Sequence, residues 1–165
     1  RNSKILHIGT HGYFDQKLPD IVGVLTAGAK ENGHITPGFL SLNQLLSKPV
    51  SSDLVFVSGC ETMVGKNYKG SGMRSITRGF LAQGAKSVVG TIWPIQDRPT
   101  SVFVKKFYVN LLETDGDAPR ALQITQRDFH RGGKYRHPKY WAGFVLTSTN
   151  QGDSQIFSRE IANNR

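Results

Sequence analysis

The chain has 165 residues, 38% of them hydrophobic, and a formal net charge of +9. This length suits one globular domain with one core and is too short for two ordinary domains. No apolar run approaches the roughly 20 residues that cross a bilayer, so we expect a soluble, cytoplasmic protein with no membrane span and no signal peptide. The single cysteine excludes an intramolecular disulfide and suits a reducing compartment.

The first half of the chain predicts buried strands separated by loops and one short helix. The strand runs are apolar and β-branched, and the loops are rich in glycine and polar residues. In chain order we expect a strand at 4–9, a polar loop at 11–20, irregular or hairpin structure at 21–36 around Asn32-Gly33, a helix capped by Ser41 at 41–47, a strand at 53–58 and a long loop at 61–72.

The second half predicts three helices and two strands. Apolar residues recur at helical spacing after Met73, after Pro99 and after the start signal at 117–119. We expect a helix from Met73 to a stop at Gly84, a strand at 87–92 ended by Trp93-Pro94, a helix from Pro99 with one stripe of Val104, Phe107, Tyr108, Leu111 and Leu112, a helix from Asp117, and a strand at 141–147. This order predicts a layered α/β fold with a mostly parallel sheet.

Cys60 and His11 each follow an expected strand by a few residues. A thiolate is a strong nucleophile, and an imidazole titrates near neutrality, so the pair suits nucleophilic catalysis at one sheet edge. A buried, inert thiol is the alternative, although core cysteines normally sit within the apolar run. The backbone N–H groups of Gly12 and Cys60 could together hold an oxyanion. His7 lies within its strand and is read as a packed or cross-strand histidine.

Five motifs resemble the CHAT domain, a caspase-like peptidase domain that is similar to the separase protease domain. They are LHIGTHGYFD at 6–15, DLVFVSGCET at 53–62, GFLAQGAKSVV at 79–89, WPIQD at 93–97 and HPKYWAGFV at 137–145. The resemblance implies a three-layer α/β/α caspase-like fold. It also implies that residues 1–165 are the C-terminal catalytic portion of a longer chain, lacking N-terminal strands and preceded by tetratricopeptide-type repeats.

The resemblance also implies a catalytic dyad. The histidine of the family's T-H-G motif falls on His11, and the cysteine of its S-A-C-E-T motif falls on Cys60, with Gly59 in place of alanine. It assigns the oxyanion-hole amides to Gly12 and Cys60. A third triad residue is not required, and we expect neither a metal ion nor a cofactor.

Asp97 ends a segment that resembles the separase segment lining the pocket for the residue before the cleaved bond. A carboxylate there would bind arginine or lysine. Spacing alone also allows Asp97 to be a helix N-cap, because it lies just before Pro99. Trp93 could wall the same pocket or be an ordinary buried aromatic at a strand end.

These residues predict a cysteine endopeptidase that cleaves a specific protein after Arg or Lys and is activated by a partner. By analogy with the family, its setting could be a bacterial defence system with a gasdermin-like or RNA-guided component. The alternative is a catalytically idle caspase-like interaction module. A third hypothesis, nucleic-acid binding, is expected only indirectly if at all, although basic residues concentrate at Arg127, Arg131, Lys134, Arg136 and Lys139.

Overall fold

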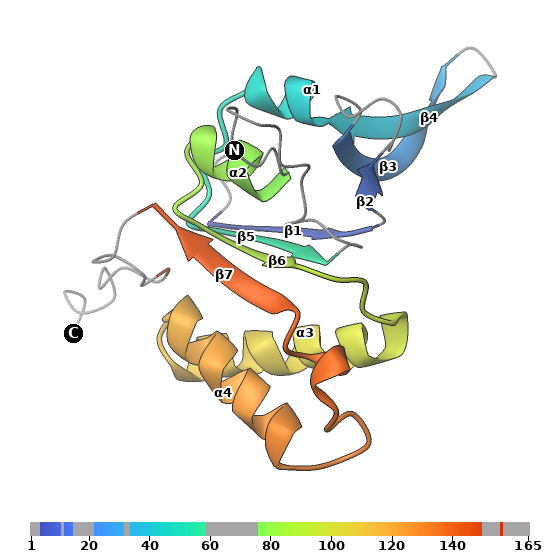
Figure 1. The fold of residues 1–165 in the computed structure, drawn as a ribbon. Coiled ribbons are helices and arrows are strands. Elements are labelled where there is room, and N and C mark those ends of the chain that lie inside the picture. Colours follow the sequence, from blue (N-terminus) through green and yellow to red (C-terminus); the bar gives the residue numbers. More distant parts are fainter. Residues whose placement is uncertain are drawn as a thin grey trace, which may run out of the picture.

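The computed structural model describes residues 4–10, 12–14, 22–31, 34–58, 76–149 and 156. Its centre is a four-stranded sheet in the order β1-β5-β6-β7 (Figure 1). Three neighbouring strands are parallel and β7 is antiparallel to β6, which confirms the mostly parallel sheet. The strands are β1 (Ile5–Gly9), β5 (Leu54–Ser58), β6 (Ser87–Thr91) and β7 (Phe144–Ser148).

Helices cover both faces of this sheet (Figure 1). In β5, Leu54 and Phe56 belong to the core cluster on the α3 and α4 face, whereas Val55 and Val57 belong to the cluster with α1 and α2. All four side chains are 0% exposed, which explains why the strand is apolar at every position. The layered α/β fold is therefore confirmed, with α1 (Leu42–Leu46), α2 (Ile76–Ala82), α3 (Asp97–Glu113) and α4 (Ala118–Arg131).

Local capping signals set several helix ends where the sequence predicts them. Ser41 caps α1 by accepting from the backbone N–H of Gln44, whose side chain accepts from the Ser41 N–H in return. Asp117 caps α4 by accepting from the N–H of Arg120. Gly84 follows α2 with a φ of 106°, a left-handed conformation that favours glycine.

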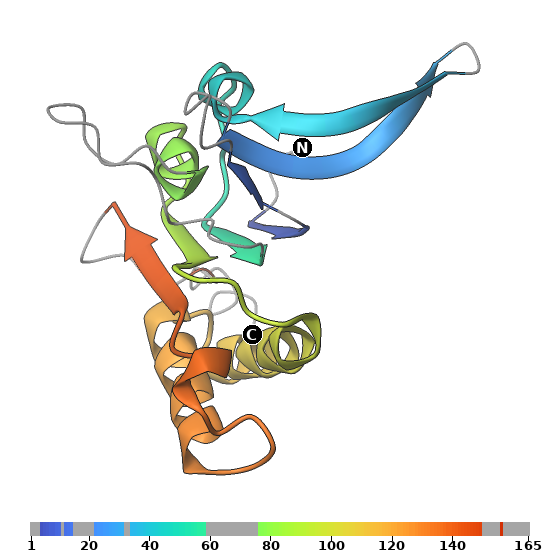
Figure 2. The same ribbon diagram turned by 45° about the vertical axis from the view of Figure 1, so that its right-hand side comes forward.

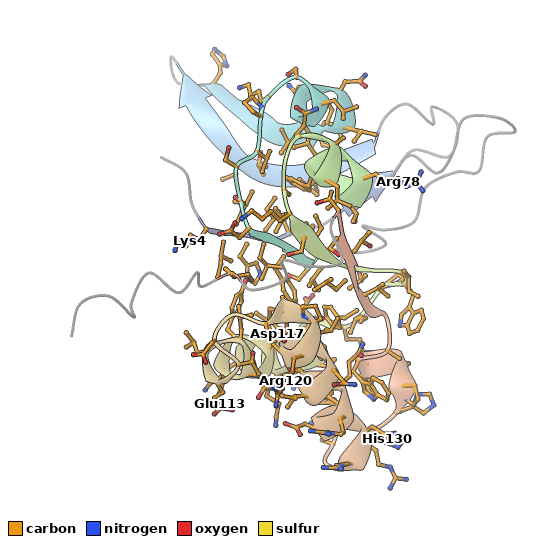
Figure 3. The ribbon with its side chains drawn as sticks, turned by 90° about the vertical axis from the view of Figure 1, so that its left-hand side faces the viewer. Lys4, Arg78, Glu113, Asp117, Arg120 and His130 are labelled. Carbon is orange, nitrogen blue, oxygen red and sulfur yellow. The ribbon has the colours of Figure 1, made fainter. Side chains whose placement is uncertain are left out.

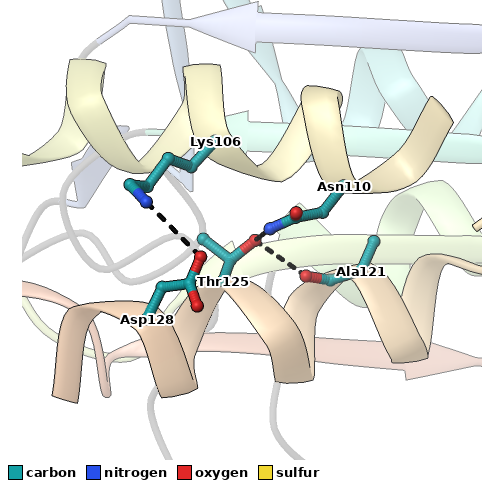
Figure 4. Close-up of polar contacts among 5 residues, drawn as sticks. All are labelled: Lys106, Asn110, Ala121, Thr125 and Asp128. Carbon is teal, nitrogen blue, oxygen red and sulfur yellow. Dashed lines mark hydrogen bonds and ion pairs between the residues drawn. The ribbon is translucent and has the colours of Figure 1, made fainter. Parts of the chain in front are cut away.

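Buried polar contacts hold α3 against α4 (Figure 4). The Asn110 side chain donates to Thr125 Oγ1 at 2.9 Å, and Thr125 donates to the carbonyl of Ala121 at 2.7 Å. Because these buried groups satisfy one another, the helices pack without an orphaned donor or acceptor there. At the rim, Lys106 and Asp128 form an exposed ion pair at 3.4 Å, which contributes at most about 1 kcal/mol.

A second sheet of three antiparallel strands extends away from the central sheet (Figure 2). It contains the hairpin expected at 21–36, with Glu31 opposite His34. The third strand pairs Gly12 with Val24 and lies within the segment expected to be a polar loop at 11–20. The strands are β2 (Gly12–Phe14), β3 (Val22–Glu31) and β4 (His34–Ser41).

Three expectations need correction. Helix α3 begins at Asp97 rather than Pro99, because a proline in the first turn has no N–H that needs a helical partner. Leu112 is 68% exposed, so it does not belong to the buried stripe of α3. The last strand begins at Phe144 rather than 141, because a 3₁₀ turn (Pro138–Tyr140) and the residues after it precede the strand.

Other expectations lie partly or wholly outside the described residues. His11, Cys60 and the loop at 61–72 are among them, as are the first residues of the helix expected from Met73. In the part of the chain that the structure does describe, no helix has the length and apolar character needed to cross a membrane.

Candidate active site

Three parallel strands end together at one edge of the sheet, at Gly9, Ser58 and Thr91. Gly9 and Ser58 are direct register partners, and neighbouring strands lie about 4.8 Å apart. His11 follows Gly9 by two residues, and Cys60 follows Ser58 by two. Two residues span at most about 7 Å. The segments that lead to His11 and to Cys60 therefore start from adjacent positions, at the ends of β1 and β5.

The residues on either side of His11 are both tied to β3. Thr10 donates its hydroxyl to the carbonyl of Leu25 at 2.7 Å. Gly12 is the first residue of β2 and pairs with Val24. Residues 10 and 12 are therefore both held beside β3. The catalytic roles of His11 and Cys60, and the oxyanion-hole role of Gly12, stay predictions.

A cavity of about 410 Å³ opens at this same edge, between the strand ends and the first turns of α3. It reaches Thr10, which precedes His11, and Ser58, which lies two residues before Cys60. The surface of its wall is mostly apolar, although most of its lining residues carry polar side chains. The lining residues are His7, Gly9, Thr10, Ser58, Thr91, Ile95, Asp97, Thr100, Ser101, Val104 and Lys105.

Asp97 is exposed and lines this cavity from the first position of α3. The N-cap is Gln96, so the alternative reading of Asp97 as the N-cap is wrong. Thr100, Ser101 and Val104 follow at helical spacing and line the same cavity, because residues three and four apart share a helix face. Among the described residues, no hydrogen bond or ion pair engages the Asp97 carboxylate.

His7 is exposed, lines the cavity from β1, and contacts residues of β5 and α3. Its ring stacks on Phe56, its register partner, with centroids 5.2 Å apart. Its Nε2 lies 3.3 Å from Ser58 Oγ, and its Nδ1 lies 3.0 Å from the Tyr108 hydroxyl. In a neutral ring one nitrogen donates and the other accepts, so the two contacts satisfy both. The reading of His7 as a packed, cross-strand histidine is confirmed.

Burial shifts the titration of both rings in this network. Removal from water lowers the pKa of His7 below its ordinary value, which favours the neutral imidazole. The same cause raises the pKa of Tyr108 to about 12, so its hydroxyl stays protonated at neutral pH. The lowered pKa of His7 therefore favours a neutral imidazole in the cavity wall at neutral pH.

The His7 shift predicts a loss of stability in mild acid. As pH falls below about 6.5, the unfolded chain binds a proton at His7 that the folded chain does not, so the free energy of unfolding decreases. We expect His7→Gln to cost about 1 kcal/mol at neutral pH through its hydrogen bonds and to flatten this decrease. Urea midpoints measured between neutral pH and mild acid check it, with His34→Gln on the β4 hairpin as the matched control. Parallel curves for wild type and His7→Gln would contradict the prediction.

Trp93 supports the segment between β6 and α3. Its Nε1 donates to the carbonyl of Lys139 at 3.1 Å, and its ring covers Gly143, where an added Cβ would meet the indole at 2.8 Å. Trp93 is not among the residues that line the cavity described above. Its described contacts tie this segment to the residues around Lys139 and Gly143, and its role in substrate binding stays a prediction.

Comparison with known protein families shows to which family the chain belongs. The sequence matches the CHAT domain over residues 1–149. The chain belongs to the CHAT-domain family. The CHAT domain is a caspase-like domain related to cysteine peptidases, so the resemblance found in the motifs is confirmed.

Two relatives of this CHAT domain are mammalian. Over 110 residues the chain is 31% identical to tetratricopeptide repeat protein 28 of Mus musculus, covering 65% of the chain and 4% of that protein. Over 75 residues it is 35% identical to tetratricopeptide repeat protein 28 of Homo sapiens, covering 46% of the chain and 3% of that protein. The chain thus spans a small part of the relatives it matches, and both fit the association of CHAT domains with tetratricopeptide repeats.

Sequence reasoning missed most of the cavity wall of this CHAT domain. His7, Ser58, Thr100 and Ser101 were not proposed as site residues, yet they line the cavity. The position of Ser58 at the end of a parallel strand was a usable signal, because ligands of α/β sheets bind at that edge. Within the described ranges, no group of three or more His, Cys, Asp or Glu side chains is placed to hold a metal ion.

Proposed function

We propose that this CHAT domain is a cysteine endopeptidase that cleaves a specific protein substrate after an arginine or lysine. The observation that carries the proposal is the cavity at the ends of β1 and β5, with the Asp97 carboxylate in its wall. The cavity lies beside the ends of these two strands, and in the sequence His11 and Cys60 each follow a strand end by two residues. Family membership supports the peptidase class, and Asp97 supports the preference for a basic residue.

The chemistry of the cavity wall favours a cation at the Asp97 end. A guanidinium there would form charge-assisted hydrogen bonds with the carboxylate and would have the hydroxyls of Thr100 and Ser101 as further acceptors. Lys105 lines the same cavity eight residues further along α3, about 12 Å along the helix axis. Its positive charge would repel a basic side chain from the far end and leave Asp97 as the favourable partner.

The proposed mechanism assigns one step to each motif residue. The Cys60 thiolate attacks the scissile carbonyl carbon, and the N–H groups of Gly12 and Cys60 stabilise the resulting oxyanion. The C–N bond then breaks while His11 protonates the leaving amine, which leaves a thioester. Water attacks the thioester carbonyl and gives one proton to His11, and the C–S bond then breaks. The product leaves as a carboxylate that releases its proton to solvent, which restores the Cys60 thiolate and the protonated His11.

We place this activity in a longer, cytoplasmic protein in which residues 1–165 form the catalytic portion. The mammalian tetratricopeptide repeat relatives support neighbouring repeats as a scaffold or regulatory partner. A role in a bacterial defence system rests on the family resemblance only. Partner binding could activate the enzyme through the segment at 61–72, which follows the proposed nucleophile directly.

The test is cleavage of short fluorogenic peptides that differ only in the residue before the cleaved bond. With the full-length protein, we expect kcat/KM for Arg and Lys to exceed that for Leu or Asp by about 10-fold or more, the gain expected from a charge-assisted pair. Mixtures with candidate repeat-containing partners test activation. A preference for Asp or Leu would overturn the assignment of the pocket, whereas cleavage by the Cys60→Ala protein would overturn the peptidase mechanism.

A further inference from the structure

A second hollow, of about 530 Å³, lies at the far end of α4 and is lined almost entirely by basic side chains. Arg131 is the last residue of α4, and Arg136 lies in the segment that leads to the 3₁₀ turn. Gly133 lies between them in the sequence, and its φ of 90° is a conformation that favours glycine. The lining residues are His130, Arg131, Arg136, His137 and Pro138.

The positive charge of this hollow has no counter-charge among the described residues. The described ion pairs join Lys86 to Asp53 and Lys106 to Asp128, and no described residue forms a hydrogen bond or ion pair with the guanidinium of Arg131 or Arg136. Cations near a helix C-terminus stabilise the helix, which accounts for His130 and Arg131. Arg136 and His137 lie beyond the helix, so the helix dipole does not explain them.

Contacts with aromatic rings position the two histidines. The His130 ring meets Trp141 edge-on with centroids 5.9 Å apart, and the His137 ring meets Tyr140 at 6.5 Å. His137 Nδ1 accepts from the backbone N–H of Lys139 at 3.2 Å. In the neutral ring its proton therefore sits on Nε2, which can donate to a ligand.

We infer that this hollow binds a phosphate monoester carried by a protein partner. Two guanidinium groups and two imidazoles around one open hollow match the charge and the three terminal oxygens of a phosphorylated serine or threonine. The site is separate from the cavity at the strand ends, and the inference does not depend on the proposed peptidase activity.

The neighbouring aromatic residues argue against nucleic acid as the occupant. Single-stranded nucleic acid binds through rings on which bases can stack. Here Tyr135, Tyr140 and Trp141 are partly buried and already in ring contacts, and Lys139 lies 4.8 Å from the centre of the Tyr140 ring.

The test is binding of a short phosphoserine peptide to the full-length protein, followed by tryptophan fluorescence. Both tryptophans of the chain are tied to this segment, because Trp141 Nε1 donates to the Arg136 carbonyl and Trp93 Nε1 to the Lys139 carbonyl. We expect Arg131→Gln and Arg136→Gln each to weaken binding about 10-fold. The matched control is Arg120→Gln, which removes the same charge from the other end of α4 and should change binding less than about twofold (Figure 3).

Three outcomes would overturn the inference. The first is no binding of the phosphopeptide at low salt, where screening is weakest. The second is an equal loss for Arg120→Gln, which would indicate a diffuse charge effect. The third is an RNA oligonucleotide that binds at least as tightly as the phosphopeptide and responds to the same two substitutions. All four basic residues are exposed, so circular dichroism of the variants should show an intact fold. The unphosphorylated serine peptide is the ligand control.

Discussion

The Cys60→Ala variant is expected to lose cleavage of every basic peptide, with kcat/KM falling by more than about 10³-fold. Alanine removes the sulfur that attacks the scissile carbonyl and forms the thioester. Without that attack no leaving amine is formed for His11 to protonate. The measurement is the rate with the best Arg or Lys peptide, compared with wild type at equal concentration and after the same activation step.

Two controls separate this loss from unfolding. Cys60 is the only cysteine in the chain, so alkylation by iodoacetamide should add one label within residues 1–165 and abolish activity in parallel. The thermal midpoint of Cys60→Ala should stay within a few degrees of wild type, since alanine is a small-for-small change. Cleavage by the Cys60→Ala protein at the wild-type rate would contradict the mechanism. Full biological function of Cys60→Ala, with partner binding intact, would instead favour the catalytically idle interaction module.

Asp97→Asn is expected to lower kcat/KM for Arg and Lys peptides by about 10- to 100-fold while leaving Leu peptides nearly unchanged. The neutral amide keeps the size of the side chain but loses the charge that would pair with a guanidinium or ammonium. Because this interaction exists before and during the chemical step, the change should fall on KM rather than on kcat. Asp97→Lys should go further and make an acidic residue the preferred one.

Glu113→Gln is the matched control for Asp97, because it removes one negative charge from the other end of the same helix. It should leave both specificity and kcat/KM unchanged. Asp97 also lies in the first turn of α3, where a negative charge favours the helix, so Asp97→Asn should cost about 0.3 to 1 kcal/mol of stability. An equal decrease in kcat/KM for all peptides would show that Asp97 only stabilises the helix and does not bind the substrate side chain.

Local signals predicted most of the central elements correctly. The apolar run at 54–57 is a strand buried on both faces, Ser41 caps the helix that it was expected to cap, and the helix expected from Asp117 starts there, with Asp117 as its N-cap. Each of these depends on a few neighbouring residues, such as a side-chain oxygen and the N–H three residues on. The start of α3 and the exposure of Leu112 were misjudged because the first turn of a helix tolerates proline and because burial at a helix rim depends on what packs there.

The residues of the candidate site were also predicted only in part. Motif and strand-end reasoning selected His11, Cys60 and Asp97, and the structure brings the strand ends before His11 and Cys60 together with Asp97 around one cavity. It could not select His7 as part of that cavity. The phenol that faces His7 belongs to Tyr108, 101 residues away, and no local pattern reports such a contact.

By itself the sequence determined the family, the alternation of strands and helices, and the residue types proposed to carry the chemistry, because motifs, caps and apolar periodicity act over a few residues. Only the tertiary structure decided which side chains share a cavity, that Asp97 stands in its wall rather than capping α3, and that Arg131 and Arg136 line one hollow. These facts depend on strand register and helix packing, which join residues far apart in the chain.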